Sequence, residues 1–481
     1  MTSFLDNLIR GFCFSFLCIP VLMGPWLFGA WEMWWFWPFA TLIFVATLFS
    51  ALRLFLQSCA RPQVNGVRRE IAPKVQMRLL YSVVPFLVYA FVRFGQASVY
   101  MDAERSFLLF LTPWLLAVTL ICGVNGHQRR ILFWLLVANL ALLGLYGICN
   151  HLKTGSELVL WAEGYAQYYN DGRASGSFFC PDHFAGAMEL GICLGLGLLL
   201  GGGVRFRNRV TGMVIITIGL VGVVMSKSRG AGLTVIVVFV AIAIWGMTYL
   251  PRAARWWWRA SVSSLLAMAV LLLVCFSGDY ITRFGRYFGW ATARQQSPRE
   301  AIAVMSNRVR SRGRYQMSSA AIRAWQSERW IGIGPGMHKH VWSHYGPSTD
   351  GDRDAGVWPS YANNDYVSNE VHNDWVELLE EFGIVGSALF LVPFVFLCAV
   401  MLRALGHDAR RNRIRAIRED HECRDLDDAL LLGGFLTIIS MSFHSLGDFN
   451  LQIPGVNWMV SAIVALSLGT LGTHLVDQKN S

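Results

Sequence analysis

The chain has 481 residues, of which 54% are hydrophobic and only 15% are charged, and its mean hydropathy is +0.43. These values lie far outside the usual range for soluble globular proteins and exclude an ordinary water-soluble fold. The formal net charge of +10 favours anionic ligands, and no nucleic-acid partner is expected.

Apolar runs of about 17 to 22 residues recur along the chain, and each is long enough to cross a bilayer core of roughly 30 Å. They predict an all-α polytopic membrane protein with about twelve transmembrane helices. The predicted spans are residues 11–29, 35–56, 79–96, 106–124, 131–149, 184–201, 209–225, 231–249, 260–277, 384–402, 429–446 and 456–474. We expect one membrane domain over 1–481, with a large, mainly helical loop at 278–383 and a basic loop at 403–428.

Arginine and lysine alternate between the connections in a way that predicts orientation, because cationic short loops resist translocation. The cationic connections are 61–74, 129–130, 205–209, 252–255 and 403–424. The other set carries Glu32, Asp102, Glu104, Glu157 and Glu163 with few cations. Both termini should therefore be cytoplasmic, and the loop 278–383 should lie on the outer side, since long loops cross largely regardless of charge.

The ten cysteines predict neither a disulfide framework nor a metal site. Most lie inside predicted spans, where a thiol usually serves as a small packing residue. No CxxC pair and no Cys/His spacing typical of zinc is present, so we expect no structural zinc.

Within the loop 278–383, an arginine-rich run at 308–315 predicts a helix that continues to Trp325, and the Gly-Ile-Gly-Pro-Gly segment at 332–336 predicts a turn. A second helix is predicted to begin at Ser368 and to end at Gly383, because apolar residues recur there at helical spacing. Its opposite face carries Asn373, Glu377, Glu380 and Glu381, which predicts an amphipathic helix where protein, membrane surface and water meet.

Cations occur at the outer ends of two predicted spans, where the positive-inside pattern disfavours them. Lys227, Ser228 and Arg229 join spans seven and eight almost without a loop, and Arg173 precedes span six. Such charges need a carboxylate partner or a bound anion. With Arg314 of the loop they predict an outer anion site, since guanidinium groups bind phosphate oxygens bidentately. Snorkelling to the interface is the alternative for the 227–229 cations.

His372 is the expected proton acceptor, because a position at a helix start keeps an imidazole neutral. Asp374 or Glu377 could instead act as the base, or could orient His372. The loop holds three rival histidines, namely His338, His340 and His344. His444 and Asp448, at the end of span eleven, could line the same cavity.

These segments together resemble the bacterial O-antigen ligase and polymerase superfamily of membrane glycosyltransferases. The matching motifs are Arg-x-Ser-Gly with a following proline at 173–185, Ser-Arg-Gly-Ala at 228–231, the glycine-rich turn at 332–336, His-Asn-Asp-Trp at 372–375 and Glu-Phe-Gly-Ile-Val-Gly at 381–386. Their order and the long outer loop before span ten agree with the family. One departure is Pro181-Asp182-His183, where the family more often has asparagine after the proline.

The resemblance implies transfer of a glycan from a polyprenyl (undecaprenyl) diphosphate carrier to an acceptor hydroxyl on the periplasmic face of the bacterial inner membrane, without cofactor, nucleotide sugar or metal. It implies His372 as the activating base and Arg229, Arg173 and, more weakly, Arg314 as ligands of the diphosphate. The acceptor could be a lipid core, a growing polysaccharide or a protein. An anion transporter or flippase is the alternative of another class, but most spans are uniformly apolar, whereas transport favours charges deep in the spans.

Overall fold

A computed structural model describes residues 3–60, 74–154, 172–201, 206–249, 296–310, 312–346, 368–415 and 425–476, with isolated positions between 263 and 290. Within these ranges the chain is helical, no strand is assigned, and eleven helices are long and apolar enough to cross a membrane. The predicted all-α polytopic fold is confirmed. The predicted ninth span, 260–277, falls almost wholly outside the described residues.

Among the described residues, eight long helices precede the loop: α1 (Ser3–Met23), α2 (Met33–Ala60), α3 (Lys74–Gly95), α4 (Tyr100–Cys122), α5 (Gly126–Thr154), α6 (Pro181–Leu200), α7 (Phe206–Ser226) and α8 (Arg229–Tyr249). The loop contributes α12 (Pro298–Arg310), α13 (Gly313–Ser327) and α14 (His338–Tyr345). The chain closes with α15 (Asp374–Arg415), α16 (Asp425–His444) and α17 (Pro454–Val476). Short 3-10 turns follow α1 (Gly24–Trp26, Phe28–Ala30) and precede α17 (Asn450–Gln452).

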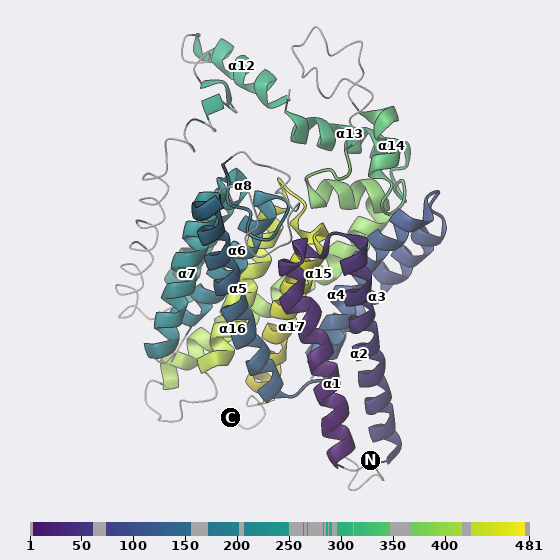
Figure 1. Ribbon diagram of the computed structural model, residues 1–481, viewed down its shortest axis with the longest axis vertical. Helices are drawn as coiled ribbons and strands as arrows, with labels where there is room; N and C mark the ends of the chain where they lie inside the picture. Colours follow the sequence, from purple (N-terminus) through teal and green to yellow (C-terminus); the bar gives the residue numbers. More distant parts are fainter. Residues whose placement is uncertain are drawn as a thin grey trace.

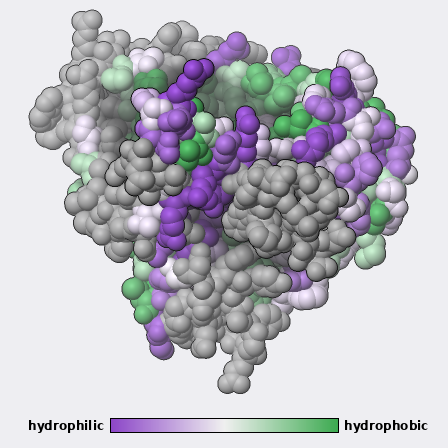
Figure 2. Space-filling view, turned by 90° about the horizontal axis from the view of Figure 1, so that it is seen from above, coloured by the Kyte–Doolittle hydropathy of each residue, from purple (hydrophilic) through white to green (hydrophobic). Residues whose placement is uncertain are grey.

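The long helices form one bundle, and α12, α13 and α14 gather at one end of it, called here the loop end (Figure 1). Helix α1 begins and α17 finishes toward the opposite end. Seen from the loop end, hydrophilic side chains form a band across the molecule (Figure 2). The connections predicted to lie on one side of the membrane, such as those joining α3 to α4 and α7 to α8, are thus collected at one end.

Helix α6 is the centre of the bundle. Of its apolar span 89% is buried, against 17% for the span of α15, and it packs most closely against α7 and α16. Glycines permit this approach: a Cβ on Gly195 would lie 2.8 Å from the Gly212 carbonyl, and one on Gly197 would strike the Ala429 carbonyl. Small residues let membrane helices pack with their backbones close together. Polar side chains at the loop end of α6 are therefore held in a rigid setting.

Helix α15 differs from its prediction in two ways. It begins at Asp374, whereas the sequence predicted a start at Ser368, because Asn373 caps it: the Asn373 Oδ1 accepts from the Val376 amide at 3.1 Å. It does break where predicted, since Gly383 adopts φ 64° and ψ −169°, a backbone region that is essentially restricted to glycine.

The amphipathic pattern predicted that the acidic face of α15 meets water, but the structure buries this face. Glu377, Glu380 and Glu381 are buried. Glu380 meets the His338 Nδ1 at 2.9 Å, and Glu381 accepts from the Ser106 hydroxyl at 3.0 Å and the Gly336 amide at 2.5 Å. The loop therefore covers this polar face: His338 contacts Glu380, and Gly336 contacts Glu381.

The loop helices also differ from prediction in extent. The single helix predicted from 308 to 325 is divided between α12 and α13, with Gly313 starting the second. The turn at 332–336 is observed, and all three of its glycines have positive φ. The Arg93 guanidinium donates to the Gly332 carbonyl at 2.7 Å, and Lys339 pairs with Asp102 at 2.6 Å. These contacts fasten the loop to α3 and α4.

Candidate active site

The connection between α7 and α8 is a tight turn at the loop end. Lys227 adopts a left-handed conformation with φ 51°, which is strained for a residue with a side chain. Ser228 then caps α8, because its Oγ accepts from the Ala231 amide at 3.3 Å. The turn leaves Arg229 as the first residue of α8, where the helix dipole favours an anion.

Asp182, in the first turn of α6, lies between two arginines. Its Oδ1 is 2.5 Å from Arg173, and its Oδ2 is 2.7 Å from Arg314. Arg173 also donates to the Ser226 carbonyl at 2.7 Å, which ties the segment before α6 to the end of α7. The Ser228 hydroxyl hydrogen-bonds Asp182 as well. Three of the segments singled out in the sequence therefore meet at this carboxylate.

His372 lies two residues before α15 in an unusual backbone conformation, with φ 57°. The flanking residues fix it there: the Asn373 side-chain Nδ2 donates to the Leu446 carbonyl at 2.9 Å, and the Asp374 backbone amide donates to the Ser445 carbonyl at 3.0 Å. His372 therefore stands outside the helix, and not at its start as the sequence predicted. Non-glycine residues in this conformation gather at functional sites.

The imidazole of His372 is oriented by Asp448. Its Nδ1 lies 3.1 Å from the Asp448 Oδ1, and its side chain is 26% exposed, whereas Asp448 is fully buried. The Phe449 ring packs edge-on against the rings of both His372 and His183, with centroids 4.6 Å away in each case. A buried carboxylate on one ring nitrogen leaves the other available to a substrate, which is the arrangement of a general base and its orienting acid.

Arg314 joins the two carboxylates of the site. It lies 2.7 Å from Asp182 and 3.4 Å from Asp448. Burial favours the neutral form of Asp448, but the charge of Arg314 and the hydrogen bond to His372 outweigh it and hold the pKa of Asp448 well below its usual value. Burial likewise opposes the charge on Arg314, and the two carboxylates outweigh it and raise the pKa of Arg314. Asp448 is therefore ionised throughout the neutral range.

Below this layer a histidine and a carboxylate are paired inside the bundle. His444 Nδ1 lies 2.7 Å from the Glu189 Oε1, and the other Glu189 oxygen accepts from the Ser440 hydroxyl at 2.7 Å. His444 Nε2 is 3.9 Å from the Asp448 Oδ2. All of these side chains are 1% exposed or less. His444 is thus placed beneath the site, facing Asp448.

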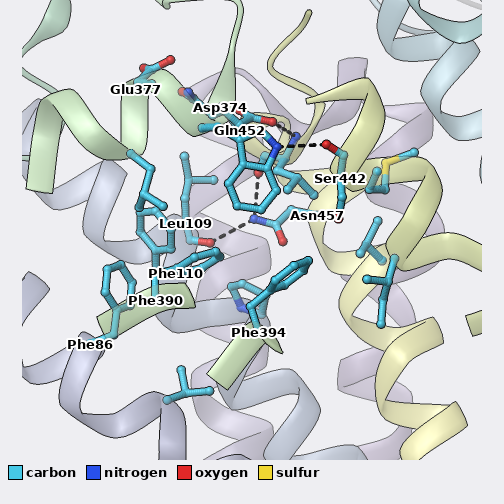
Figure 3. A pocket seen from close by; sticks show the side chains of 18 of the residues that line it. Phe86, Leu109, Phe110, Asp374, Glu377, Phe390, Phe394, Ser442, Gln452 and Asn457 are labelled. Carbon is cyan, nitrogen blue, oxygen red and sulfur yellow. Dashed lines mark hydrogen bonds between the residues drawn. The ribbon is translucent and has the colours of Figure 1, made fainter. Parts of the chain in front are cut away.

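On the other side of the α15 start lies a cavity of about 280 Å³, enclosed by α3, α4, α15, α16 and α17 (Figure 3). Phenylalanines form much of its wall, and Asp374, Glu377 and Glu381 stand at its polar rim. The Asp374 Oδ2 accepts from the Ser445 hydroxyl at 2.6 Å, while its Oδ1 is buried and has no hydrogen-bond partner among the described residues. Asp374 and Glu377 therefore face this cavity, whereas His372 faces the arginines.

Most of the predicted site residues meet around Asp182 and Asp448, whereas Asp374 and Glu377 line the apolar cavity. Arg173, Ser228, Arg314, His372 and His444 each contact Asp182, Asp448 or both, and Lys227 and Arg229 flank Ser228. The rival histidines have other partners: His338 pairs with Glu380, His340 with Asp102 at 2.8 Å, and His344 packs on Tyr345. Across the described ranges, no group of three or more His, Cys, Asp or Glu side chains is arranged to hold a metal ion.

Sequence reasoning left two residues without a role. Asp182 appeared only as a departure from the family pattern, and Glu189, within the predicted span 184–201, was not singled out. The signal for Glu189 was its charge within an apolar helix, which demands a partner. That partner, His444, is 255 residues away in sequence and could be named only from the packing of α6 against α16.

A comparison with protein-family models matches residues 212–391 to the family described as O-antigen ligase. Over these residues the chain is similar to O-antigen ligases. The match runs from α7 into α15 and includes the 227–229 turn, Arg314, the glycine-rich turn and His372. No curated protein matches the chain.

The resemblance that the motifs predicted is supported over the matched residues, and the long apolar helices are those of a multi-pass membrane protein. Asp182, Glu189, His444 and Asp448 lie outside the matched segment. The structure nevertheless brings Asp182 and Asp448 against Arg314 and His372 of the matched segment.

Proposed function

We propose that this protein transfers a glycan from a polyprenyl diphosphate carrier, such as undecaprenyl diphosphate, to a hydroxyl group of an acceptor. The observation that carries the proposal is the pairing of a half-buried His372 with a fully buried, ionised Asp448, directly beside arginines suited to an anionic group. A base and an anion site at one place are what displacement of a diphosphate by a hydroxyl requires.

In the proposed step, His372 Nε2 accepts the proton of the acceptor hydroxyl while Asp448 holds Nδ1. The acceptor oxygen forms a bond to the anomeric carbon of the glycan, and the bond from that carbon to the diphosphate oxygen breaks. The electron pair stays on the diphosphate. General-base assistance of this kind typically accelerates a reaction by about 10² to 10⁴ fold.

The leaving diphosphate would lie at the start of α8. Arg229 and the cap residues Lys227 and Ser228 surround the helix N-terminus, which favours anions. Arg314 is the more exposed of the two arginines around Asp182, since its side chain is 34% exposed, against 11% for Arg173. We therefore assign Arg229 and Arg314 to the diphosphate and Arg173 to holding Asp182, and through it Arg314, in place.

We further propose that the loop end is periplasmic, that the loop 278–383 covers the site and that both termini are cytoplasmic in a bacterial inner membrane. The carrier's hydrocarbon chain would remain in the bilayer while its head enters between the loop and the bundle. The acceptor would approach from the side of Asp374 and Glu377. A lipid core, a growing polysaccharide and a protein all offer suitable hydroxyl groups.

The direct test is reconstitution. The full chain in liposomes, supplied with a glycan on polyprenyl diphosphate, should release free polyprenyl diphosphate and extend a hydroxyl acceptor, and His372→Ala should lose this activity. Full transfer by His372→Ala would remove the proposed base. The glycan profile of cells lacking the protein identifies the acceptor, since loss of capped lipid core, of chain length or of glycoprotein are three different results.

Sidedness has its own test. A reporter fused near residue 330, in the segment after α13, should be active only outside the cytoplasm. A reporter active only in the cytoplasm would invert the topology and overturn the periplasmic mechanism.

A further inference from the structure

His444 has one ring nitrogen committed and one not. Its Nδ1 donates to Glu189, whose carboxylate can only accept, so the tautomer is fixed at that end. Its Nε2 is buried and has no hydrogen-bond partner among the described residues, because the Asp448 Oδ2 at 3.9 Å lies beyond hydrogen-bonding distance. A buried polar atom without a partner in a well-packed bundle calls for an explanation.

The space beside this nitrogen is bounded by Gly230, the second residue of α8. A Cβ on Gly230 would lie 3.3 Å from the His444 Nε2 and 4.0 Å from the Ser228 Oγ. Gly230 is not among the residues with positive φ, so its backbone does not require glycine. With no side chain at Gly230, the backbone at the start of α8 lies close to the imidazole nitrogen.

We propose that the His444 Nε2 donates a hydrogen bond to an oxygen of a bound diphosphate at the N-terminus of α8, with Glu189 as the residue that positions the imidazole. Two independent features meet there: a helix start, which favours anions, and a buried, unpartnered ring nitrogen that faces it. The assignment rests on the proposed function for the identity of the ligand, and it makes His444 a donor-side rather than an acceptor-side residue.

Carboxylates lie on both sides of the His444 ring. Glu189 from α6 faces Nδ1, and Asp448 from the following connection faces Nε2. A ring placed between carboxylates is stabilised with both nitrogens protonated. An imidazolium can donate to Glu189 and to a phosphate oxygen at once, and it adds a cation beneath the site where negative charge develops on the leaving group.

Glu189 accordingly does more than neutralise a charge. Its two oxygens are shared between His444 and the Ser440 hydroxyl, both on α16, so the carboxylate of α6 fixes the ring relative to that helix. Because α6 also packs against α8, the distance from Nε2 to the start of α8 is set by helix packing. A preorganised donor of this kind costs no reorganisation when the ligand binds.

The test measures the binding of inorganic pyrophosphate to the purified full chain in detergent micelles by titration calorimetry. Gly230→Ala places a methyl group 3.3 Å from the His444 Nε2, and we expect it to raise the Kd at least tenfold. Gly447→Ala is the matched control, because a Cβ there meets nothing within 4 Å. It should leave the Kd within twofold.

A second variant removes the donor itself. His444→Gln combined with Glu189→Gln keeps a neutral hydrogen-bonded pair and avoids a lone buried charge, and it should also raise the Kd at least tenfold. Binding of pyrophosphate by Gly230→Ala and by the double variant within twofold of the unsubstituted chain overturns the proposal, as does the absence of pyrophosphate binding by the unsubstituted chain.

The outcomes separate this proposal from the proposed function. Full glycan transfer by His372→Ala would refute the catalytic scheme and leave the pyrophosphate measurements standing. Normal pyrophosphate binding by Gly230→Ala, together with loss of transfer in His372→Ala, would refute the role of His444 and leave the catalytic scheme intact.

Discussion

His372 and Asp374 are only two positions apart in the chain, but their side chains lie in opposite environments. On one side His372 faces Asp448, Arg314 and Asp182, where every charged group has a partner of opposite charge. On the other side Asp374 stands at the rim of a cavity walled by α3, α4, α15, α16 and α17, which is lined mainly by apolar side chains (Figure 3). One region is crowded and ionic, and the other is open and apolar.

The two regions differ in how well they tolerate substitution. A satisfied ionic network fixes its members and is costly to disturb, because any group left without a partner keeps its desolvation penalty. An apolar cavity has no such penalty, and its walls can accept changes of side-chain volume. Substitutions on the ionic side should therefore change the reaction, while those on the cavity side should change it little.

The largest effect is expected from His372→Ala. Loss of the base should lower the rate of glycan transfer by about 10³ fold, within the range typical of general-base catalysis. Transfer in proteoliposomes, followed by release of polyprenyl diphosphate, measures this. His344→Ala is the matched control, since that imidazole lies on α14 against Tyr345, and it should retain activity. Equal activity of the two variants would contradict the special position of His372.

Asp448→Asn should destabilise the fold as well as slow transfer. Removing one partner from a buried ion pair typically costs about 3 to 5 kcal/mol, because Arg314 loses a compensating charge. The depressed pKa means that Asp448 contributes its full stabilisation above the unfolded value of about 4 and loses it as the pH falls through the folded value.

Thermal unfolding in detergent at pH 7 and at pH 3 checks this linkage. The Tm difference between Asp448→Asn and the unsubstituted chain should be large at pH 7 and smaller at pH 3. A difference that did not shrink in acid would mean that Asp448 stabilises the fold by something other than its charge.

Arg229→Lys should have an intermediate effect. Lysine keeps the charge but loses the two-pronged guanidinium, so a bidentate contact to phosphate is lost, and a charge-assisted hydrogen bond is worth about 1.5 to 3 kcal/mol. The apparent affinity for the diphosphate donor should fall at least tenfold. Arg308→Lys on the exposed face of α12 should change nothing, and an unimpaired Arg229→Lys would reduce Arg229 to an interfacial anchor.

The smallest effect is expected inside the cavity. Val460→Leu on α17 adds a methylene where space exists, so its cost should fall below the 1 to 3 kcal/mol typical of an overpacked core, and transfer should stay within twofold. Val456→Leu, one turn earlier and fully buried away from the cavity, should lower the Tm more. A larger loss of activity from Val460→Leu than from Arg229→Lys would show that the cavity is as demanding as the ionic side.

Much of the fold could be predicted from sequence, because helix length and apolarity are local properties that the bilayer enforces. The described spans begin and end within six residues of their predicted bounds. The exceptions are α1, whose start lies eight residues earlier, and α15, whose C-terminal end lies thirteen residues later. Gly383 as the break in α15 was likewise predictable, since glycine is required at its φ and ψ.

The site was only partly predictable, because its contacts join distant segments. The pattern identified His372 and the cations, but a carboxylate in the sequence carries no mark of its partner: Asp182 is 132 residues from Arg314, and Asp448 is 76 from His372. The glutamates of α15 misled for a related reason. Helical periodicity reports which face is polar, and a polar face can be covered by a loop that bonds to it as well as by water.

The most direct test of the account is a double-mutant cycle on transfer rate between His372→Ala and Asp448→Asn. If Asp448 acts by orienting His372, its loss matters only while the imidazole is present, so the double variant should transfer at the rate of His372→Ala alone. Rate losses that simply multiply would contradict this account, because they would mean that the two residues act independently.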